Sequence, residues 1–393
     1  MAKKDERIKK YTKKDGSTAY MFNSVYLGIN PQTGKPLKAT KRGFKTPTEA
    51  KNELKRLTFE ATQEFQSKKE CNKTFEEVYH EWYESYINTV RESTWARTDV
   101  MFQNHILPAL GKYRIRTITT VQCQKALNKW FKITTHNYKG WFNYTHAVFE
   151  YAIVQEYITE NPTKRVIMPK KSAKAGKKAP NFWDKKQLQT FFSYMDPDKE
   201  LERYTLFRIL AFTGIRRGEC LALTWDDLNI KKSTLNINKT LTQGARGKQI
   251  IQATKTRKGN RILSLDATTL FYIKKWRLEQ KHELFNLGYN STGPDQLIFT
   301  TTKNTFKSLN TPKKWLDIIT NRMKQDDIVL PYITIHGFRH SHASAMFAAG
   351  ATIKEVQERL GHEDVETTLN IYTHVTDQQN KEAVQKLVNF LDF

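Results

Sequence analysis

Hydrophobic positions along the chain change their spacing several times, and each change predicts a different kind of element. Residues 18–27 and 37–44 are short β-prone runs that a turn-rich stretch at 30–34 separates. Thr46 and Pro47 then carry the signature of a helix start, a capping side chain followed by proline at the first helical position. The N-terminal region is therefore expected to form a small sheet backed by one helix.

The apolar spacing that follows is helical. Phe75, Val78, Trp82 and Tyr86 recur at intervals of three and four residues, which places them on one face of a helix. The same reasoning predicts further helices over residues 93–106, 119–130 and 136–158. The first of these is expected to stop before Pro108, since proline lacks a backbone N–H. The aromatic residues of the last helix are expected to lie in a core rather than to stack on bases.

The C-terminal half mixes helical and strand-like spacing. Helices are predicted over residues 184–194, 200–212 and 217–223, and again from Asp266 onward. Three short strand-like runs lie between them, at residues 234–241, 249–253 and 261–265. The two later runs are expected to form a hairpin around residues 254–260.

The amino-acid composition indicates the kind of molecule that the protein binds. The 393 residues include 65 Lys and Arg against 40 Asp and Glu, a net charge of +25. This excess favours a polyanion such as DNA, and affinity that depends on counterion release weakens as salt rises. Residues 163–178 hold seven basic residues and no acid, which is typical of a linker lying along a DNA backbone. For the basic N-terminus, a solvated extension without a partner is the alternative.

Other features argue against competing classes of protein. No long apolar run predicts a membrane span, and no apolar signal core follows the charged first residues. The cysteines, Cys71, Cys123 and Cys220, are odd in number and far apart. This pattern fits a reducing cytoplasm and argues against a cysteine-based zinc site. We therefore expect a cytoplasmic protein that faces DNA.

Four separated segments of the C-terminal half carry side chains suited to binding a phosphodiester. In the first, Arg216 and Glu219 follow a Thr-Gly-Ile turn, whose glycine lets the next helix aim its N-terminus at a phosphate. The second offers Lys255 between two strand-like runs. The third is His-Gly-Phe-Arg, in which His336 and Arg339 lie one helical turn apart and can meet one phosphate.

The fourth segment begins with Leu-Gly-His at residues 360–362, and Tyr372 follows ten residues after His362. Each segment alone has an ordinary explanation, such as a solvated arginine or one amphipathic tyrosine among seventeen. The clustered histidines near His336 also suggest a metal, but no carboxylate or cysteine lies there at ligand spacing. The four segments together are more specific than any one.

This order of segments resembles the catalytic region of the tyrosine recombinases, which include phage, Xer and conjugative-transposon integrases. The family shows Thr-Gly-x-Arg-x-x-Glu, a hairpin lysine, His-x-x-Arg, Leu-Gly-His and then a tyrosine, and every position is occupied here. The resemblance implies a multidomain fold. Its parts are a small sheet plus helix that binds arm-type DNA sites, an all-α core-binding domain, and a mixed, mainly α catalytic domain with a small antiparallel sheet. The arm-binding domain is expected at 1–69, the core-binding domain at 73–168 and the catalytic domain at 181–393. A basic linker at 169–180 is expected between the last two.

The resemblance also implies a role for each catalytic residue. Tyr372 would attack phosphorus, form a 3′-phosphotyrosyl bond and lead through a Holliday junction to strand exchange without ATP, cofactor or metal. Arg216 and Arg339 would clamp the nonbridging oxygens as negative charge develops. Glu219 is expected to orient an arginine or histidine rather than to take part directly.

The proton transfers fall to the remaining assigned residues. Lys255 would protonate the leaving 5′-oxygen, with Lys258 and Lys248 as alternatives on the same expected hairpin. His336 and His362 would donate hydrogen bonds to the phosphate or manage the proton of the tyrosine.

DNA contacts and partners complete the expectations. Basic residues outside the catalytic region are expected to touch DNA, namely Lys38, Lys41, Arg42, Lys170, Lys171 and Lys174. The resemblance implies double-stranded DNA with core-type and arm-type attachment sites, a homotetramer on DNA, an excisionase and a host DNA-bending protein. The apolar residues of the tail at 381–393 recur at helical spacing, which suits docking on a neighbouring subunit or an intramolecular cap. A type IB topoisomerase-like enzyme and a non-catalytic DNA-binding regulator are the alternative functions.

Overall fold

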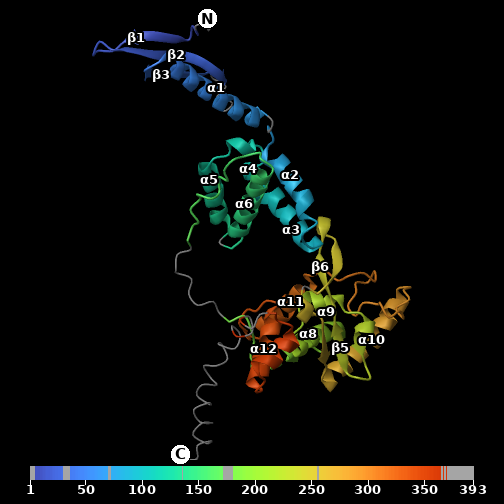
Figure 1. The fold of residues 1–393 in the computed structure, drawn as a ribbon. Helices are drawn as coiled ribbons and strands as arrows, with labels where there is room; N and C mark the ends of the chain where they lie inside the picture. The colour runs from blue at the N-terminus through green and yellow to red at the C-terminus, as the bar shows by residue number, and fades with distance from the viewer. Residues whose placement is uncertain are drawn as a thin grey trace, which may run out of the picture. The chain divides into compact units, whose positions relative to one another are not determined.

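The computed structural model describes residues 5–29, 36–69, 72–134, 136–170, 180–254, 256–363, 366 and 369, and only the backbone of 62–69 and 257. The chain divides into two compact units, Met1–Ala173 and Lys174–Phe393 (Figure 1).

The first unit begins with a three-stranded antiparallel sheet. Its strands, in spatial order, are β1 (Ile8–Thr12), β2 (Thr18–Ile29) and β3 (Pro36–Phe44). Helix α1 (Pro47–Lys69) packs on the sheet, and Phe22 and Leu54 are buried between the two. The Thr46 hydroxyl accepts a hydrogen bond from the Glu49 N–H at 3.2 Å, which confirms the predicted helix start. Strand β1, which carries two adjacent lysines, was not among the expected strands.

A helical region follows in the same unit. Its elements are α2 (Phe75–Tyr86), α3 (Glu92–Met101), η1 (Phe102–Ile106), α4 (Leu107–Leu110), η2 (Ile115–Thr117), α5 (Thr120–Ile133) and α6 (Tyr138–Val154). Capping boxes at Thr74 and Thr119 start α2 and α5. On α6, Trp141 and Phe149 are buried in the shared core, so the prediction that the aromatic residues of this helix form a core is confirmed for them.

The helix expected to stop before Pro108 runs past it. The π-helical turn η1 joins α3 to α4, and the Leu107 N–H donates to the carbonyl of Phe102, five residues back. This wider turn places Pro108 in the first turn of α4, where its missing N–H costs no intrahelical hydrogen bond. The expected boundary is therefore wrong because a π turn absorbs the proline.

The second unit is mainly helical. Its helices are α7 (Lys185–Ser193), α8 (Leu201–Thr213), α9 (Arg217–Ala222), α10 (Ala267–Asn286), α11 (Thr311–Gln325), α12 (Gly337–Ala348) and α13 (Ile353–Leu360). Helix α8 contacts α9, α10, α11 and α12, and its Leu206, Phe207 and Leu210 are buried in the core. The predicted class, a mainly α unit with small antiparallel sheets, is confirmed.

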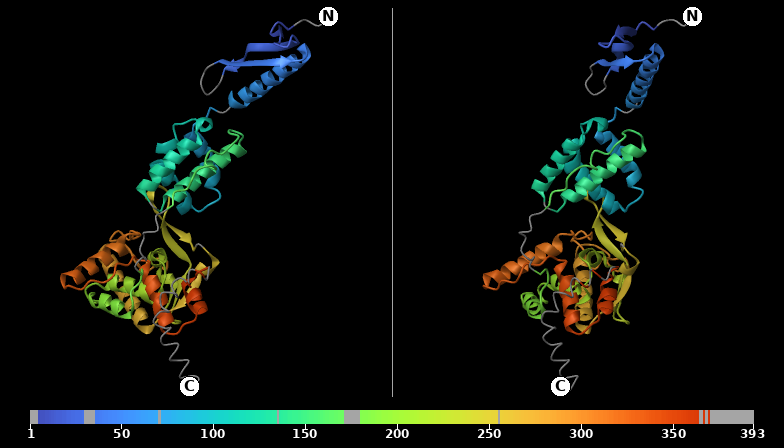
Figure 2. Two further views of the ribbon diagram at one scale, coloured as in Figure 1. Left: turned by 90° about the vertical axis from the view of Figure 1, so that its left-hand side faces the viewer. Right: turned by 60° about the vertical axis from the view of Figure 1, so that its left-hand side comes forward.

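The strands of this unit form two small sheets. The chain from 234 to 243 runs through both, because its first part pairs with 261–264 and its second part with 249–253; this pair of arms is called the ribbon. They are β4 (Leu228–Asn229), β5 (Thr234–Ile237), β6 (Lys239–Gln243), β7 (Gln249–Ala253) and β8 (Arg261–Ser264), with short 3₁₀ turns at η3 (Trp225–Asp227), η4 (Ala245–Gly247) and η5 (Arg257–Gly259). β5 lies between β4 and β8, whereas β6 pairs only with β7. The β6–β7 part projects from the body of the unit (Figure 2).

The expected hairpin between the runs at 249–253 and 261–265 is therefore wrong. Each run pairs instead with part of 234–243, as the partners Lys239↔Ala253 and Thr234↔Ser264 show. The tip of the ribbon lies at 244–248, and the described residues 256–260 form a loop in the returning arm, between β7 and β8. Apolar alternation predicts the strands but carries no information on which pair.

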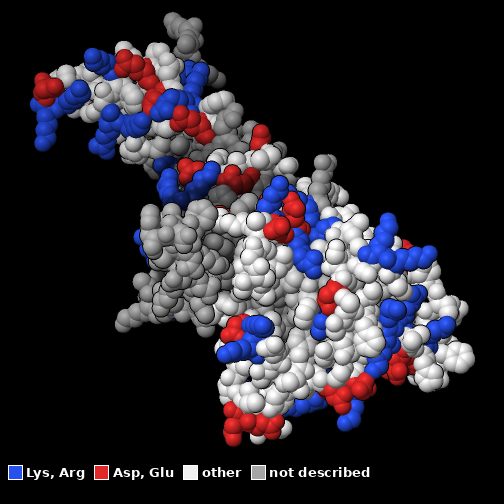
Figure 3. All heavy atoms as spheres, turned by 90° about the horizontal axis from the view of Figure 1, so that it is seen from below, with Lys and Arg blue, Asp and Glu red and all other residues white. Residues whose placement is uncertain are grey.

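The net charge does not by itself locate a DNA-binding surface. On the face that Figure 3 shows, lysine and arginine side chains are interspersed with aspartate and glutamate. Within the described ranges no helix is both long and apolar enough to cross a bilayer.

Candidate active site

Arg216 lies at the start of α9, directly after the tight turn that ends α8. Gly214 makes this turn with a φ of 65°, and a Cβ there would lie 2.6 Å from the ring of His342, so only glycine fits. Nη1 of Arg216 donates to Oε1 of Glu219 at 2.7 Å, and its backbone N–H donates to Oε2 at 2.9 Å. The side chain is 42% exposed, so the guanidinium is held in place and still faces solvent.

Glu219 is the buried carboxylate that orients this arginine. It also accepts a hydrogen bond from Nη2 of Arg261 at 3.0 Å. Burial alone would raise the pKa of the Glu219 carboxyl, but the positive charges of Arg261 and Arg216 hold that pKa below its usual value. The carboxylate is therefore ionised near neutral pH and is in direct contact with Arg216.

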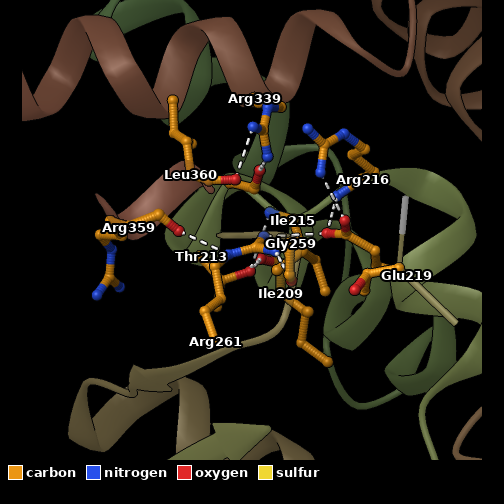
Figure 4. Close-up of polar contacts among 12 residues, drawn as sticks. Ile209, Thr213, Ile215, Arg216, Glu219, Gly259, Arg261, Arg339, Arg359 and Leu360 are labelled. Atoms are coloured by element: carbon orange, nitrogen blue, oxygen red, sulfur yellow. Dashed lines mark hydrogen bonds and ion pairs between the residues drawn. The ribbon is translucent and has the colours of Figure 1, made fainter. Parts of the chain in front are cut away.

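Arg339 lies in the first turn of α12 and is 1% exposed. Its Nη1 donates to the carbonyl of Gly214 at 2.9 Å, and its Nη2 donates to the carbonyl of Leu360 at 2.7 Å (Figure 4). Burial and the nearby charge of Arg216 lower the pKa of Arg339 to about 9, so it is charged at neutral pH. Each terminal nitrogen keeps a second N–H. Arg339 thus joins the turn before Arg216 to the end of α13.

Two of the predicted histidines belong to the same group. His336 is the N-cap of α12 and keeps an exposed surface, yet desolvation of its ring and nearby positive charges lower its pKa. His362 follows the end of α13 and is 6% exposed. Burial, followed by the charges of Arg339 and Arg216, lowers the pKa of His362 to about 3. Three of the four predicted segments therefore meet at one place, with neutral imidazoles beside two guanidiniums.

The remaining predicted catalytic residues are not all placed. Tyr372 and Lys255 lie outside the described residues, as do Lys171 and Lys174. The loop at 256–260, which follows Lys255 in the sequence, is described.

This loop packs against the end of α13. Gly361 ends the helix with a φ of 67°, and a Cβ there would lie 2.5 Å from the carbonyl oxygen of Lys258. The Lys258 side chain is exposed. Lys248, in contrast, lies at the tip of the ribbon, directly before strand β7 in the sequence. Of the two alternative lysines, Lys258 is the one on the loop beside the site.

Substitution of Gly361 by alanine is expected to destabilise the protein more than the same change at Gly350. Both glycines have positive φ, 67° and 89°, where a side chain costs about 1–2 kcal/mol. A Cβ at Gly350 meets no atom within 4 Å, whereas at Gly361 it would collide with the Lys258 carbonyl. Urea unfolding of the two variants measures the difference. Equal losses would show that the loop yields easily at Gly361.

Two site residues were missed by the sequence reasoning. Arg261 in β8 contacts Glu219, and Arg359 in the last turn of α13 donates to the carbonyls of Phe212 and Ser264. A signal for Arg261 existed. In the run that begins there, Leu263 and Leu265 are buried, so alternation places Arg261 on the same inward face, which is unusual for an arginine.

His342 on α12 is held by hydrogen bonds at both of its ring nitrogens. Its Nδ1 donates to the carbonyl of Ala211 at 2.9 Å, so its Nε2 accepts from Nε of Arg359 at 3.1 Å. Burial chiefly, and then the Arg359 charge, lower the pKa of His342 to about 4. A proton on Nε2 would face the Arg359 N–H, so the fold requires the neutral ring.

Acidification is therefore expected to destabilise the second unit through His342. Between pH 6.5, the usual histidine pKa, and about 4, the unfolded chain takes up a proton that the folded ring refuses, so stability falls as pH falls through this window. Buried Glu202, whose pKa burial raises to about 7, acts in the opposite direction. The test is the Tm difference between wild type and His342→Gln, which should shrink from pH 7 to pH 5. A constant difference would contradict the fixed tautomer.

The site is rich in donors and poor in metal ligands. Among the described residues no three His, Cys, Asp or Glu side chains are grouped as a metal site would require. Arg216 and Arg339 supply positive charge and N–H groups, and Glu219 is occupied by arginines. Such an arrangement suits an anion whose negative charge grows during a reaction.

The predicted DNA contacts of the first unit differ in their surroundings. Lys38 and Arg42 are exposed on β3, while Nζ of Lys41 pairs with Oε1 of Glu53 on α1 at 2.5 Å. Lys41 therefore reaches toward the helix that covers the sheet. Lys170 is exposed at the end of the described part of this unit.

Comparison with known families covers most of the chain. The sequence profile of the phage integrase family matches residues 181–379, just over half of the 393 residues. A profile described as the phage integrase N-terminal SAM-like domain matches residues 74–131. A third, described as an arm DNA-binding domain, matches residues 7–61.

Individual proteins are similar over longer stretches. A tyrosine recombinase XerC-like protein of Caldanaerobacter subterraneus subsp. tengcongensis is 26% identical over 341 residues, 80% of this chain and 82% of that protein. The Tn1549 transposon integrase in complex with a circular intermediate DNA has a TM-score of 0.63 at 19% identity, over 80% of this chain and 99% of that one. A lambda integrase tetramer bound to a Holliday junction has a TM-score of 0.52 at 15% identity, over 90% and 95%. These two structures share the fold.

Proposed function

The chain belongs to the phage integrase family, and we propose on this basis that it is a site-specific integrase that inserts and excises a mobile element, phage or conjugative transposon, in a bacterial chromosome. Enzymes of this tyrosine recombinase class cleave and rejoin DNA. The observation that carries the proposal is the meeting of Arg216, Arg339, His336 and His362 at one place, although they come from three separate segments.

The proposed reaction begins with Tyr372. Its phenolic oxygen attacks phosphorus, the bond from phosphorus to the 5′-oxygen breaks, and a 3′-phosphotyrosyl link forms. The phenol proton leaves with a base at the site, and the departing 5′-oxygen receives a proton. A 5′-hydroxyl from a second duplex reverses the step, which exchanges strands through a Holliday junction without ATP or cofactor.

The two arginines stabilise the charge that develops on phosphorus. Arg216 faces solvent and contacts the nonbridging oxygens directly, with Glu219 fixing its orientation. Arg339 adds a buried positive charge and the N–H groups that Gly214 and Leu360 leave free. His336 and His362, neutral in the DNA-free protein, donate hydrogen bonds to the phosphate or receive the tyrosine proton.

Lys255 is the proposed general acid for the 5′-oxygen. The loop at 256–260, which follows Lys255 in the sequence, reaches Gly361 through the carbonyl of Lys258 and supports a lysine of this part of the chain near the site. Lys258 is the alternative on the same loop, and Lys248 at the ribbon tip is disfavoured.

The other parts of the chain bind and assemble on DNA. Residues 1–69 bind arm-type sites through Lys38 and Arg42, with Lys41 in a lesser role because Glu53 holds it. Residues 73–168 bind the core site. The linker at 169–180 lies along the DNA backbone, which Lys170, Lys171 and Lys174 contact. Residues 181–393 cleave.

Assembly and location follow the family pattern. The active form is a homotetramer on two duplexes, and a tetramer of the similar lambda integrase on a Holliday junction supports it. An excisionase and a host DNA-bending protein are the proposed accessory partners, and the cytoplasm, on the chromosome, is the proposed location.

A covalent trap tests the function. The protein is incubated in EDTA with fragmented DNA of the strain that carries its gene, and adducts resistant to denaturation are sequenced to find the site. A nicked duplex of that site then accumulates the covalent complex, and mass spectrometry of the digested adduct should place the nucleotide on Tyr372. No adduct on any fragment would favour a DNA-binding regulator. Relaxation of a supercoil without exchange between two duplexes would favour a topoisomerase.

A further inference from the structure

Arg261 makes three hydrogen bonds from a side chain that is 7% exposed. Its Nε donates to the carbonyl of Arg359 at 2.8 Å, its Nη1 to the carbonyl of Gly259 at 2.9 Å, and its Nη2 to Oε2 of Glu219 at 3.0 Å. Figure 4 shows its guanidinium among these acceptors. All three nitrogens of the guanidinium are therefore used.

The three acceptors belong to three different segments of the proposed site. Glu219 holds Arg216 through two hydrogen bonds. Gly259 lies on the loop at 256–260, which follows Lys255 in the sequence. Arg359 lies in the last turn of α13, three residues before His362. The Arg261 side chain thus contacts the carboxylate that holds Arg216, the loop at 256–260 (the lysine loop), and the end of α13 just before His362.

The geometry depends on the shape of a guanidinium. Its N–H groups point outward in one plane in fixed directions, so three acceptors around it are fixed relative to one another. A lysine ammonium in its place keeps the charge but is a compact group on a flexible stem, without that planar fork. The close approach of Gly361 to the Lys258 carbonyl shows that the loop and the helix end already touch.

We propose that Arg261 is a positioning residue for DNA cleavage, which fixes Arg216, the lysine loop and the His362 segment relative to one another. The proposal rests on the function proposed above. Arg261 touches no reacting atom and acts through Glu219 and two backbone carbonyls. Its loss leaves Glu219 to Arg216 alone and frees the loop and the helix end to shift. Displacements of about 1 Å at such sites reduce rates on the order of 100-fold.

Arg208 provides a matched control. Its side chain is 12% exposed and joins α8 to the start of α10, through Nε to Thr269 at 3.0 Å and through Nη2 to Asp266 at 3.1 Å. Within the described part of the chain, these hydrogen bonds go to α10 and its N-cap and not to the segments that Arg261 joins. Arg208→Lys and Arg261→Lys therefore make the same chemical change at two similarly buried arginines.

The experiment measures single-turnover cleavage by the full chain on the nicked duplex recovered by adduct sequencing. A second duplex carries sulfur in place of the 5′-bridging oxygen, because a thiolate leaves without the proton that a lysine would supply. DNA affinity and Tm are measured for each variant, and cleavage is run well below every Tm. If Arg261→Lys lacks a cooperative melting transition, Arg261→Gln, which keeps an N–H donor, replaces it.

We expect Arg261→Lys to cleave the oxygen substrate about 30- to 100-fold more slowly than Arg208→Lys, with DNA affinity within about threefold. On the sulfur substrate the loss should fall below about tenfold, since the displaced lysine loop no longer matters. A merely weakened fold would lose the same factor on both. Equal cleavage of the oxygen substrate by the two variants overturns the positioning role, and an equal loss on both substrates overturns the part of that role that acts on the lysine loop. Absence of any adduct with wild type would instead overturn the proposed function.

Discussion

Replacement of Tyr372 by phenylalanine is expected to abolish the covalent protein–DNA complex while DNA binding stays unchanged. The substitution removes the oxygen that forms the new bond to phosphorus and keeps the ring. Loss of a nucleophile costs on the order of 10⁴-fold or more, so the adduct should fall below detection. The measurement is a denaturing gel of the nicked duplex after reaction, together with a binding titration.

Tyr332→Phe is the control for this change. Tyr332 is 70% exposed and belongs to the same unit, so its variant should form the complex at the wild-type rate. A complex that persists in Tyr372→Phe would mean that another of the seventeen tyrosines is the nucleophile. That result would leave the family assignment intact and move the attacking residue.

Lysine in place of Arg339 is expected to lose both cleavage and stability, whereas lysine in place of Arg216 should lose cleavage alone. Arg339 is 1% exposed and satisfies the carbonyls of Gly214 and Leu360, which one ammonium serves poorly. We expect its variant to lose about 1–3 kcal/mol of unfolding free energy. Arg216 is 42% exposed, and its replacement by lysine mainly removes the planar pair of N–H donors from the phosphate. Cleavage should fall about 100- to 1,000-fold in both.

Urea unfolding and single-turnover cleavage of the two variants check this contrast. The difference in stability is the informative quantity, because both substitutions keep the positive charge. An Arg339→Lys protein as stable as Arg216→Lys would show that the two carbonyls do not depend on the guanidinium. Normal cleavage by either variant would remove that arginine from the proposed clamp.

The helices and most strands followed from local patterns. Capping residues such as Thr46 and Thr74, and the glycine that ends α13, mark element ends because they satisfy backbone groups within a few residues. The exceptions were also local in cause. Pro108 is absorbed by a π turn, and β1 is short and rich in lysine. Sequence patterns fail to predict an element where a shift in hydrogen bonding or pairing with a neighbouring strand determines whether that element forms.

The loop that holds the lysines shows the limit more clearly. The runs at 249–253 and 261–265 have the right alternation for a hairpin, but each pairs with the strand that precedes the ribbon tip. Pairing depends on residues distant in sequence, so alternation alone left Lys248 and Lys258 as alternatives to Lys255 on one expected hairpin. The observed register places Lys248 at the ribbon tip and Lys258 on the loop beside Gly361.

By itself the sequence determined the family of this protein, since the order Arg216, Lys255, His336, Arg339, His362 and Tyr372 resembles the motifs of the tyrosine recombinases, and the phage integrase profile matches the same region. Side-chain type and spacing along the chain are local properties, and they suffice to recognise a site once its parts are known. Only the tertiary structure decided how these parts are held. Arg339 reaches Gly214 and Leu360, and Arg261 reaches Glu219, Gly259 and Arg359, across up to 125 residues of chain. Such contacts arise from packing of whole elements, which no local pattern encodes.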